Sequence, residues 1–126
     1  MDVSTSIRDI LEKHEIRVCG TDQYRDQTYT TDLEFWSPLG EDMCISIEWD
    51  GTEKSFIDGF TSYASDFDPD EHAEMWIPYR GQNGTPSSIR ALINDADAID
   101  SFLEKVAIDL NAMEERNMRE EKSNDD

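Results

Sequence analysis

Basic residues are scarce in this sequence. Its 126 residues include 11 Lys and Arg against 30 Asp and Glu, which gives a formal net charge of −19 at pH 7. Such an excess of negative charge repels the phosphates of nucleic acids and of anionic lipids. We therefore expect neither direct nucleic-acid binding nor binding to a membrane surface.

Cysteines and long apolar runs are scarce as well. Cys19 and Cys44 lie in separate segments and form no CxxC pair, so the sequence is not typical of a disulfide scaffold. No segment has the apolar character of a signal-peptide core or the length of a membrane-spanning helix. From these absences we predict a protein that is located in a reducing cytoplasm.

Aromatic residues, by contrast, are present in number and regularly spaced. Three Trp, five Phe and four Tyr recur at helix and strand periods, which a disordered acidic chain would lack. The length suffices for one domain with a single modest core. We predict one domain over residues 1–113 and a charged, disordered tail over residues 114–126.

Three segments are typical of β-strands. A short β-branched strand is expected over residues 15–20, followed by a polar loop over residues 21–27. Strict alternation of apolar and polar residues over 28–36 and 43–50, around a turn with Pro and Gly, predicts a β-hairpin. The predicted fold is therefore α+β, with a small antiparallel sheet packed against several helices.

Helical spacing of apolar residues occurs in four segments. Helices are expected over residues 4–14, 56–67 and 69–76, and over a last segment that opens with Thr85-Pro86-Ser87-Ser88. The apolar stripe of this last helix runs through Leu92, Ala96, Ile99, Leu103, Val106, Leu110 and Met113. Two interpretations stay open: the stripe packs on the sheet of its own chain, or Leu92, Ile99, Leu103, Val106 and Leu110 form a homodimer seam.

Signatures of catalysis and of metal binding are missing. The sequence has no nucleophile elbow, phosphate loop or HExxH pattern, so we expect a protein that is not an enzyme and has no cofactor. The acids from Asp66 to Asp70 resemble the start of a calcium loop, but Glu71 stands where such a loop needs Gly. Helix capping explains the same acids. His14 and His72 lack partners at zinc-ligand spacing and are expected at the surface.

The informative feature is a long interval with almost no cations. Between Arg25 and Arg80 the sequence has fourteen acids and one base, Lys54. Acids two residues apart on one strand lie about 6.5–7 Å from each other, a step similar to that between phosphates of a nucleic acid. The candidate partner-binding residues are Asp32, Glu34, Trp36, Glu41, Asp42, Glu48, Asp50, Asp66, Asp70, Glu71 and Glu74.

These acids support a functional hypothesis. A carboxylate array of this kind can occupy the basic groove of a nucleic-acid-binding protein and compete with DNA or RNA, with Trp36 as an aromatic anchor. In the alternative interpretation, the excess of acids keeps a small protein soluble and has no binding role.

Two resemblances follow from the element order and the acidic character. The order of helix, three strands and helix over residues 4–67 is similar to that of double-stranded-RNA-binding domains, but Thr52-Glu53-Lys54-Ser55 stands where those domains have a lysine cluster. In size and charge the chain resembles the small acidic anti-CRISPR and anti-restriction inhibitors of phages and mobile elements, some of which are DNA mimics. Segments 66–76 and 86–92 look like parts of small bacterial mobile-element proteins.

The second resemblance implies a function. It implies an inhibitor that acts in the cytoplasm of a bacterial host cell on a Cas effector or a restriction nuclease, by surface complementarity and without a cofactor. The alternative is a cytoplasmic immunity or antitoxin-like protein, or an adaptor, that also acts by protein–protein interaction.

Overall fold

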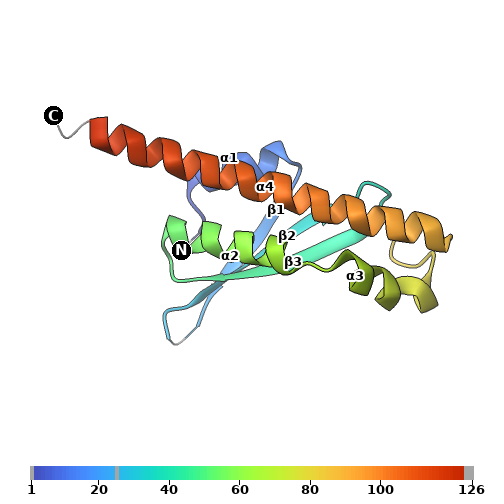
Figure 1. Ribbon diagram of the computed structural model, residues 1–126. Coiled ribbons are helices and arrows are strands. Elements are labelled where there is room, and N and C mark those ends of the chain that lie inside the picture. Colours follow the sequence, from blue (N-terminus) through green and yellow to red (C-terminus); the bar gives the residue numbers. More distant parts are fainter. Residues whose placement is uncertain (1, 25, 124–126) are drawn as a thin grey trace.

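The computed structural model describes residues 2–24 and 26–123 (Figure 1). The strands form one antiparallel sheet in the order β1-β2-β3. The elements in chain order are α1 (Thr5–Lys13), β1 (Arg17–Gln23), β2 (Tyr29–Trp36), β3 (Asp42–Trp49), α2 (Glu53–Asp66), α3 (Pro69–Trp76), the 3₁₀-helix η1 (Ile77–Tyr79) and α4 (Ile89–Ser123). The predicted α+β class and its antiparallel sheet are confirmed.

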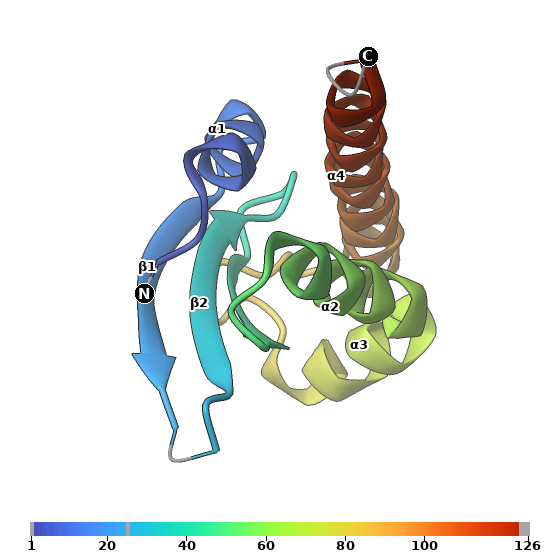
Figure 2. The same cartoon turned by 90° about the vertical axis from the view of Figure 1, so that its left-hand side faces the viewer.

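One face of the sheet carries the core, and the helices lie on that side. Figure 2 shows α2, α3 and α4 on the same side of the strands. Side chains alternate between buried and exposed along β3, as its sequence predicted, from Met43 to Trp49. α1 contacts both β1 and α4 and so closes the core at one edge. Among the described residues, no helix covers the opposite face of the sheet.

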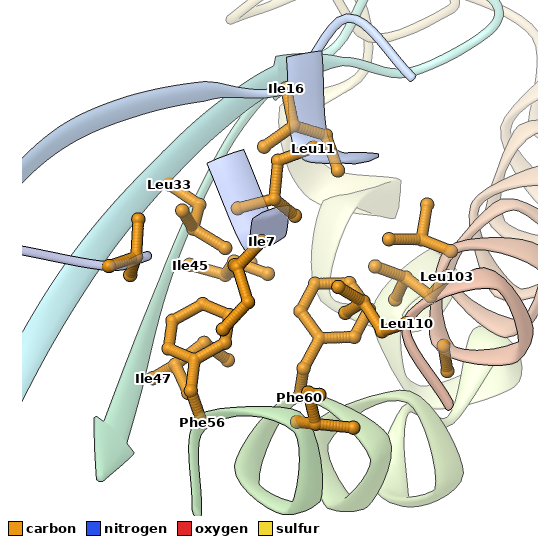
Figure 3. Close-up of a cluster of buried hydrophobic side chains, with 14 of the residues drawn as sticks. Ile7, Leu11, Ile16, Leu33, Ile45, Ile47, Phe56, Phe60, Leu103 and Leu110 are labelled. Carbon is orange, nitrogen blue, oxygen red and sulfur yellow. The ribbon is translucent and has the colours of Figure 1, made fainter. Parts of the chain in front are cut away.

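The main core joins residues from α1, β2, β3, α2 and α4. Ile7 and Leu11 of α1, Leu33 and Ile45 of the sheet, Phe56 and Phe60 of α2, and Leu103 and Leu110 of α4 point toward one another (Figure 3). Each of these side chains is essentially inaccessible to solvent. Burial of one such side chain contributes about 1.5–3 kcal/mol to stability, so this cluster is the main source of the folding free energy.

β1 is longer than its sequence predicted. We expected a loop from residue 21, but the strand continues to Gln23, which pairs with Tyr29. The hydroxyl groups of Thr21 and Thr31 are 2.8 Å apart across the two strands. These contacts between the neighbouring strands β1 and β2 have no signature in the local sequence.

α4 also differs from the expectation. It continues to Ser123, so residues 114–123 of the expected tail are helical, and residues 124–126 lie outside the described residues. Glu, Arg and Met are good helix formers, and the Asn117 side chain reaches back to Glu53 of α2 at 3.4 Å. The apolar stripe from Leu92 to Met113 is buried against the rest of the chain. Leu92, Ile99, Leu103, Val106 and Leu110 are therefore not exposed as a dimer seam.

α2 packs closely on β3 at Gly59. A methyl group at this position would lie 2.9 Å from the carbonyl oxygen of Glu48 and 3.0 Å from Cγ2 of Ile47. We therefore expect Gly59→Ala to lower the free energy of unfolding by about 1–3 kcal/mol, although Ala is the better helix former. Urea unfolding measures this loss. Ser62→Ala, at an exposed position of the same helix, is the control and should change stability by less than about 0.5 kcal/mol. Equal stability of Gly59→Ala and the unmodified protein would contradict the close contact.

Candidate partner-binding surface

The uncovered face of the sheet carries most of the predicted strand acids. The alternation of each strand directs Asp32 and Glu34 of β2 and Glu48 of β3 away from the core, and Asp22 of β1 joins them. We call these four carboxylates the acidic sheet face. Arg17 is the one cation at the outward strand positions, all of which the structure describes. The face therefore has a strong excess of negative charge.

The strand register keeps these carboxylates apart. Across β2 and β3, Asp32 lies opposite Ser46, Glu34 opposite Cys44, and Glu48 opposite Thr30. Directly opposed residues of an antiparallel pair have Cβ atoms about 4.5–5.5 Å apart, and like charges at that spacing are destabilising. Because no acid of the face lies directly opposite another acid, the sheet accommodates the array at a small electrostatic cost.

Two contacts partly engage the acids of this face. The Ser46 hydroxyl donates a hydrogen bond to Asp32 at 2.6 Å, and Arg17 lies 3.2 Å from the Glu34 carboxylate. Glu34 in turn raises the pKa of the Arg17 guanidinium. Both contacts are exposed, so they leave the carboxylates accessible to a partner. Exposed ion pairs such as Arg17–Glu34 contribute little to stability.

Trp36 stands at the end of this face. It is the last residue of β2, lies opposite Asp42, and is 66% exposed. A large aromatic side chain with this exposure gains considerable apolar burial when a partner covers it. Its prediction as a surface residue beside Asp32 and Glu34 is consistent with this placement.

The Cys44 thiol reports the electrostatic character of the face. Its pKa is raised above the usual value, first by partial burial and then by the negative charges of Asp32, Cys19 and Glu34. Cys19 and Cys44 are both free and exposed. Since only the thiolate reacts with alkylating agents, the raised pKa slows the reaction of Cys44.

This effect gives a quantitative prediction. In a Cys19→Ser background, Asp32→Asn together with Glu34→Gln should lower the pKa of Cys44 and raise its rate of iodoacetamide alkylation at pH 8 by about two- to fivefold. A pH profile of the rate, followed by mass spectrometry, measures both quantities. Neutralisation of Asp9 and Glu12 on α1 serves as the control. An unchanged profile in the sheet variant would show that the acids of the face exert no field at Cys44.

Some of the predicted acids lie outside the acidic sheet face. β3 ends at Trp49, and Asp50 belongs to the turn before α2, where its carboxylate accepts hydrogen bonds from the Thr52 N–H at 2.9 Å and the Thr52 hydroxyl at 2.6 Å. These bonds lower the pKa of Asp50. Asp42 occupies the outward position of β3 opposite Trp36 but is partly buried, so it is not counted with the four exposed or half-exposed acids of the face. The acids of α2 and α3 are exposed on the helical side of the molecule: Asp66, Asp70, Glu71 and Glu74. The structure thus places some of the predicted acids on the acidic sheet face and others on the helical side of the molecule or in turns.

Glu41 was predicted as a surface residue, and this is wrong. Its side chain is 2% exposed, and its Oε2 lies 2.9 Å from Nε2 of His72. His72 was also expected at the surface but is largely buried, with its ring 5.3 Å from that of Phe67. Glu41 lies in the β2–β3 turn and His72 lies on α3, so their contact connects two distant parts of the sequence. It is a structural contact beneath the surface.

A buried carboxylate on α4 holds the same turn from the other side. Asp95 is 1% exposed and accepts hydrogen bonds from the Ser37 hydroxyl at 2.6 Å and the Leu39 N–H at 2.9 Å. Ser37 in turn accepts a hydrogen bond from the Glu41 N–H at 2.8 Å. The sequence analysis did not identify this role of Asp95, because helical spacing alone does not show that Asp95 lies beside a turn 56 residues away.

His14 makes a similar contact at the other edge. We expected this residue at the surface, but it is partly buried, and its Nε2 lies 2.6 Å from Oδ2 of Asp109 on α4. This bond, with Lys13 3.7 Å away, holds the pKa of Asp109 below its usual value. Both histidines therefore join helices to the rest of the fold.

The acids at the start of α3 act as a helix cap. The Asp68 side chain accepts hydrogen bonds from the N–H groups of Asp70 and Glu71, which confirms the capping interpretation of this segment. Among the described residues, no three His, Cys, Asp or Glu side chains gather in a way that could hold a metal ion.

In comparisons with known proteins, no protein family, no curated protein and no solved structure matches the chain. Among the described helices, none combines the length and the apolar character needed to cross a membrane.

Proposed function

We propose that the protein is a non-enzymatic inhibitor that binds the basic nucleic-acid-binding surface of another protein, such as a Cas effector or a restriction nuclease. The observation that supports this proposal is the acidic sheet face. It presents four carboxylates on an uncovered antiparallel surface, with Arg17 as the one cation at the outward strand positions that the structure describes.

The geometry of the face suits competition with nucleic acid. Asp32 and Glu34 are alternate residues of β2, which places their side chains about 6.5–7 Å apart on the same side. A groove that binds nucleic acid has Lys and Arg side chains already arranged to contact phosphates at similar steps. Carboxylates on a rigid sheet can contact the same cations, and they lose little conformational freedom on binding.

Charge complementarity accounts for fast and specific encounter. A negative surface attracts a basic groove over several ångströms at low salt, and this raises the association rate of the correct partner. Trp36 at the end of the face adds an aromatic contact that does not depend on salt. The inhibitor then acts by exclusion, because the partner cannot hold nucleic acid and the sheet in one groove.

Capture from a bacterial lysate that is rich in nucleases tests the proposal. The baits are the unmodified protein, a sheet variant (Asp32→Asn, Glu34→Gln, Glu48→Gln) and a control variant with the same charge change on and beside α1 (Asp9→Asn, Glu12→Gln, Glu15→Gln). The control residues are all exposed. We expect the unmodified protein and the control variant to recover a nucleic-acid enzyme at low salt, and the sheet variant to lose it.

Competition by duplex DNA distinguishes the proposal from its alternative. If the captured protein is released by duplex DNA, both ligands use one groove, as proposed. A captured partner that is indifferent to DNA and to salt would contradict the inhibitor proposal and favour an immunity or antitoxin-like protein.

A further inference from the structure

A groove between α2 and α4 forms a second surface, on the helical side of the molecule. The two helices lie side by side in Figures 1 and 2 and are in direct contact. The groove has a volume of about 640 Å³ and is lined by residues of these two helices alone. It therefore shares no residue with the acidic sheet face.

The floor of the groove is made of small and apolar side chains. Ala64 of α2 and Ala107 and Ala112 of α4 leave the space open, and Ile108 is 59% exposed beside them. An isoleucine with this exposure leaves apolar area in contact with water. The floor therefore offers an apolar contact that no described residue of the chain covers.

A hydrogen bond between the helices fixes the width of the groove. The Asn111 amide donates to the Thr61 hydroxyl at 3.0 Å and to the Ala107 carbonyl at 2.7 Å. The Thr61 hydroxyl donates to the Ile57 carbonyl at 2.7 Å. Phe60 lies fully buried in the core next to this contact. The groove is thus held open by the fold and needs no rearrangement to accept a ligand.

The length of the groove matches a short helix. Its lining on α4 runs from Asp100 to Glu115, which corresponds to about 22 Å at 1.5 Å per residue, or about four helical turns, while its lining on α2 is the single turn from Thr61 to Ser65. A ridge of side chains on one helix packs into a groove between side-chain ridges on its neighbours, and small residues in that groove let the helices approach closely. An elongated groove with an alanine floor favours a helical segment over a compact ligand.

The charge of the lining residues indicates which kind of helical segment the groove can bind. Asp100, Glu104 and Glu115 line the groove, and no Lys or Arg is among the lining residues, all of which are described. A second copy of this chain would bring another net charge of −19 and is disfavoured. Nucleic acid and anionic lipid are repelled for the same reason. We call Asp100, Glu104 and Glu115 the rim of the groove. A segment with an apolar ridge flanked by Lys and Arg can contact both the apolar floor and this acidic rim.

We infer that the α2–α4 groove binds a basic amphipathic helix of a partner protein. Ile108 and the three alanines receive the apolar ridge, and Asp100, Glu104 and Glu115 contact the flanking cations. Binding at this groove does not depend on the acidic sheet face. When both surfaces contact one partner, the second contact is intramolecular and the overall affinity rises.

A designed peptide tests the inference directly. The probe is a fluorescein-labelled peptide of 18 residues with Leu at helical spacing on one face and Lys on the other. A scrambled peptide of the same composition carries the same charge without an apolar ridge. Fluorescence anisotropy at 150 mM salt measures the affinity of each peptide for the full chain. We expect the amphipathic peptide to bind at least about tenfold more tightly than the scrambled one.

Matched variants of the chain locate the binding site. Ile108→Ser should weaken binding of the amphipathic peptide about fivefold, and neutralisation of Asp100, Glu104 and Glu115 to amides should weaken it about tenfold. Ala112→Trp fills the groove and should abolish binding, with circular dichroism to verify the fold. The control variant on and beside α1 and the sheet variant should bind as the unmodified chain does. Equal affinity for the two peptides, or an unchanged affinity of Ile108→Ser and of the neutralised rim, would overturn the inference.

Discussion

Neutralising the acidic sheet face should weaken binding to a captured basic partner by about 10- to 100-fold at low salt, which corresponds to about 1.4–2.7 kcal/mol. The sheet variant removes three of the four carboxylates of the face and keeps the shape of each side chain. The loss arises mainly from the association rate, because the attraction between a negative surface and a basic groove acts before contact. Biolayer interferometry measures both rates.

Salt and the control variant make this prediction specific. Added salt screens exposed charges, so the difference between the unmodified protein and the sheet variant should shrink as salt rises. The control variant on and beside α1 has the same net charge as the sheet variant and should retain nearly full affinity. If both variants lost affinity equally, net charge would explain binding and the location of the acids would be irrelevant.

Asp95→Ala should be the most destabilising single substitution at a polar residue of the described chain, with a loss of about 3 kcal/mol in the free energy of unfolding. The buried carboxylate accepts hydrogen bonds from the Ser37 hydroxyl and the Leu39 N–H, and the buried Ser37 hydroxyl would lose its acceptor. The substitution also frees the β2–β3 turn from α4. Urea unfolding followed by tryptophan fluorescence measures the loss.

Two further substitutions separate the effect of charge from that of hydrogen bonding. Asp95→Asn keeps one good acceptor and should cost less than Asp95→Ala. Asp97→Ala, at an exposed position two residues along α4, should change stability by less than about 0.5 kcal/mol. An Asp95→Ala variant as stable as Asp97→Ala would show that the turn does not depend on this carboxylate.

The elements of the fold were predictable because each has a strong local pattern. The alternation from Met43 to Trp49 identified β3 and its buried face, and Asp68 with Pro69 identified the start of α3. The apolar stripe of α4 was also predicted, but its spacing fitted a dimer seam as well as a sheet-facing helix. The choice between the two depends on which surface lies opposite the stripe, and the stripe itself contains no such information.

The candidate site was predictable in part for the same reason. Asp32, Glu34 and Glu48 alternate with core residues, so their outward direction followed from the strand period. Asp22 was missed because pairing with β2 extends β1 beyond its β-branched residues. Glu41 was misplaced because its partner, His72, is 31 residues away and only the tertiary fold brings the two together. Long-range pairs of polar residues leave no periodic pattern in the sequence.

Protection of Cys44 on binding is the measurement that tests the central claim most directly. Cys44 lies opposite Glu34 on the acidic sheet face, so a partner that covers this face covers the thiol. In a Cys19→Ser background, we expect alkylation of Cys44 to slow at least about tenfold when the captured partner is added, while a cysteine introduced by Glu12→Cys on α1 reacts at an unchanged rate. An equal alkylation rate of Cys44 in the free protein and in the complex would contradict the proposed interface.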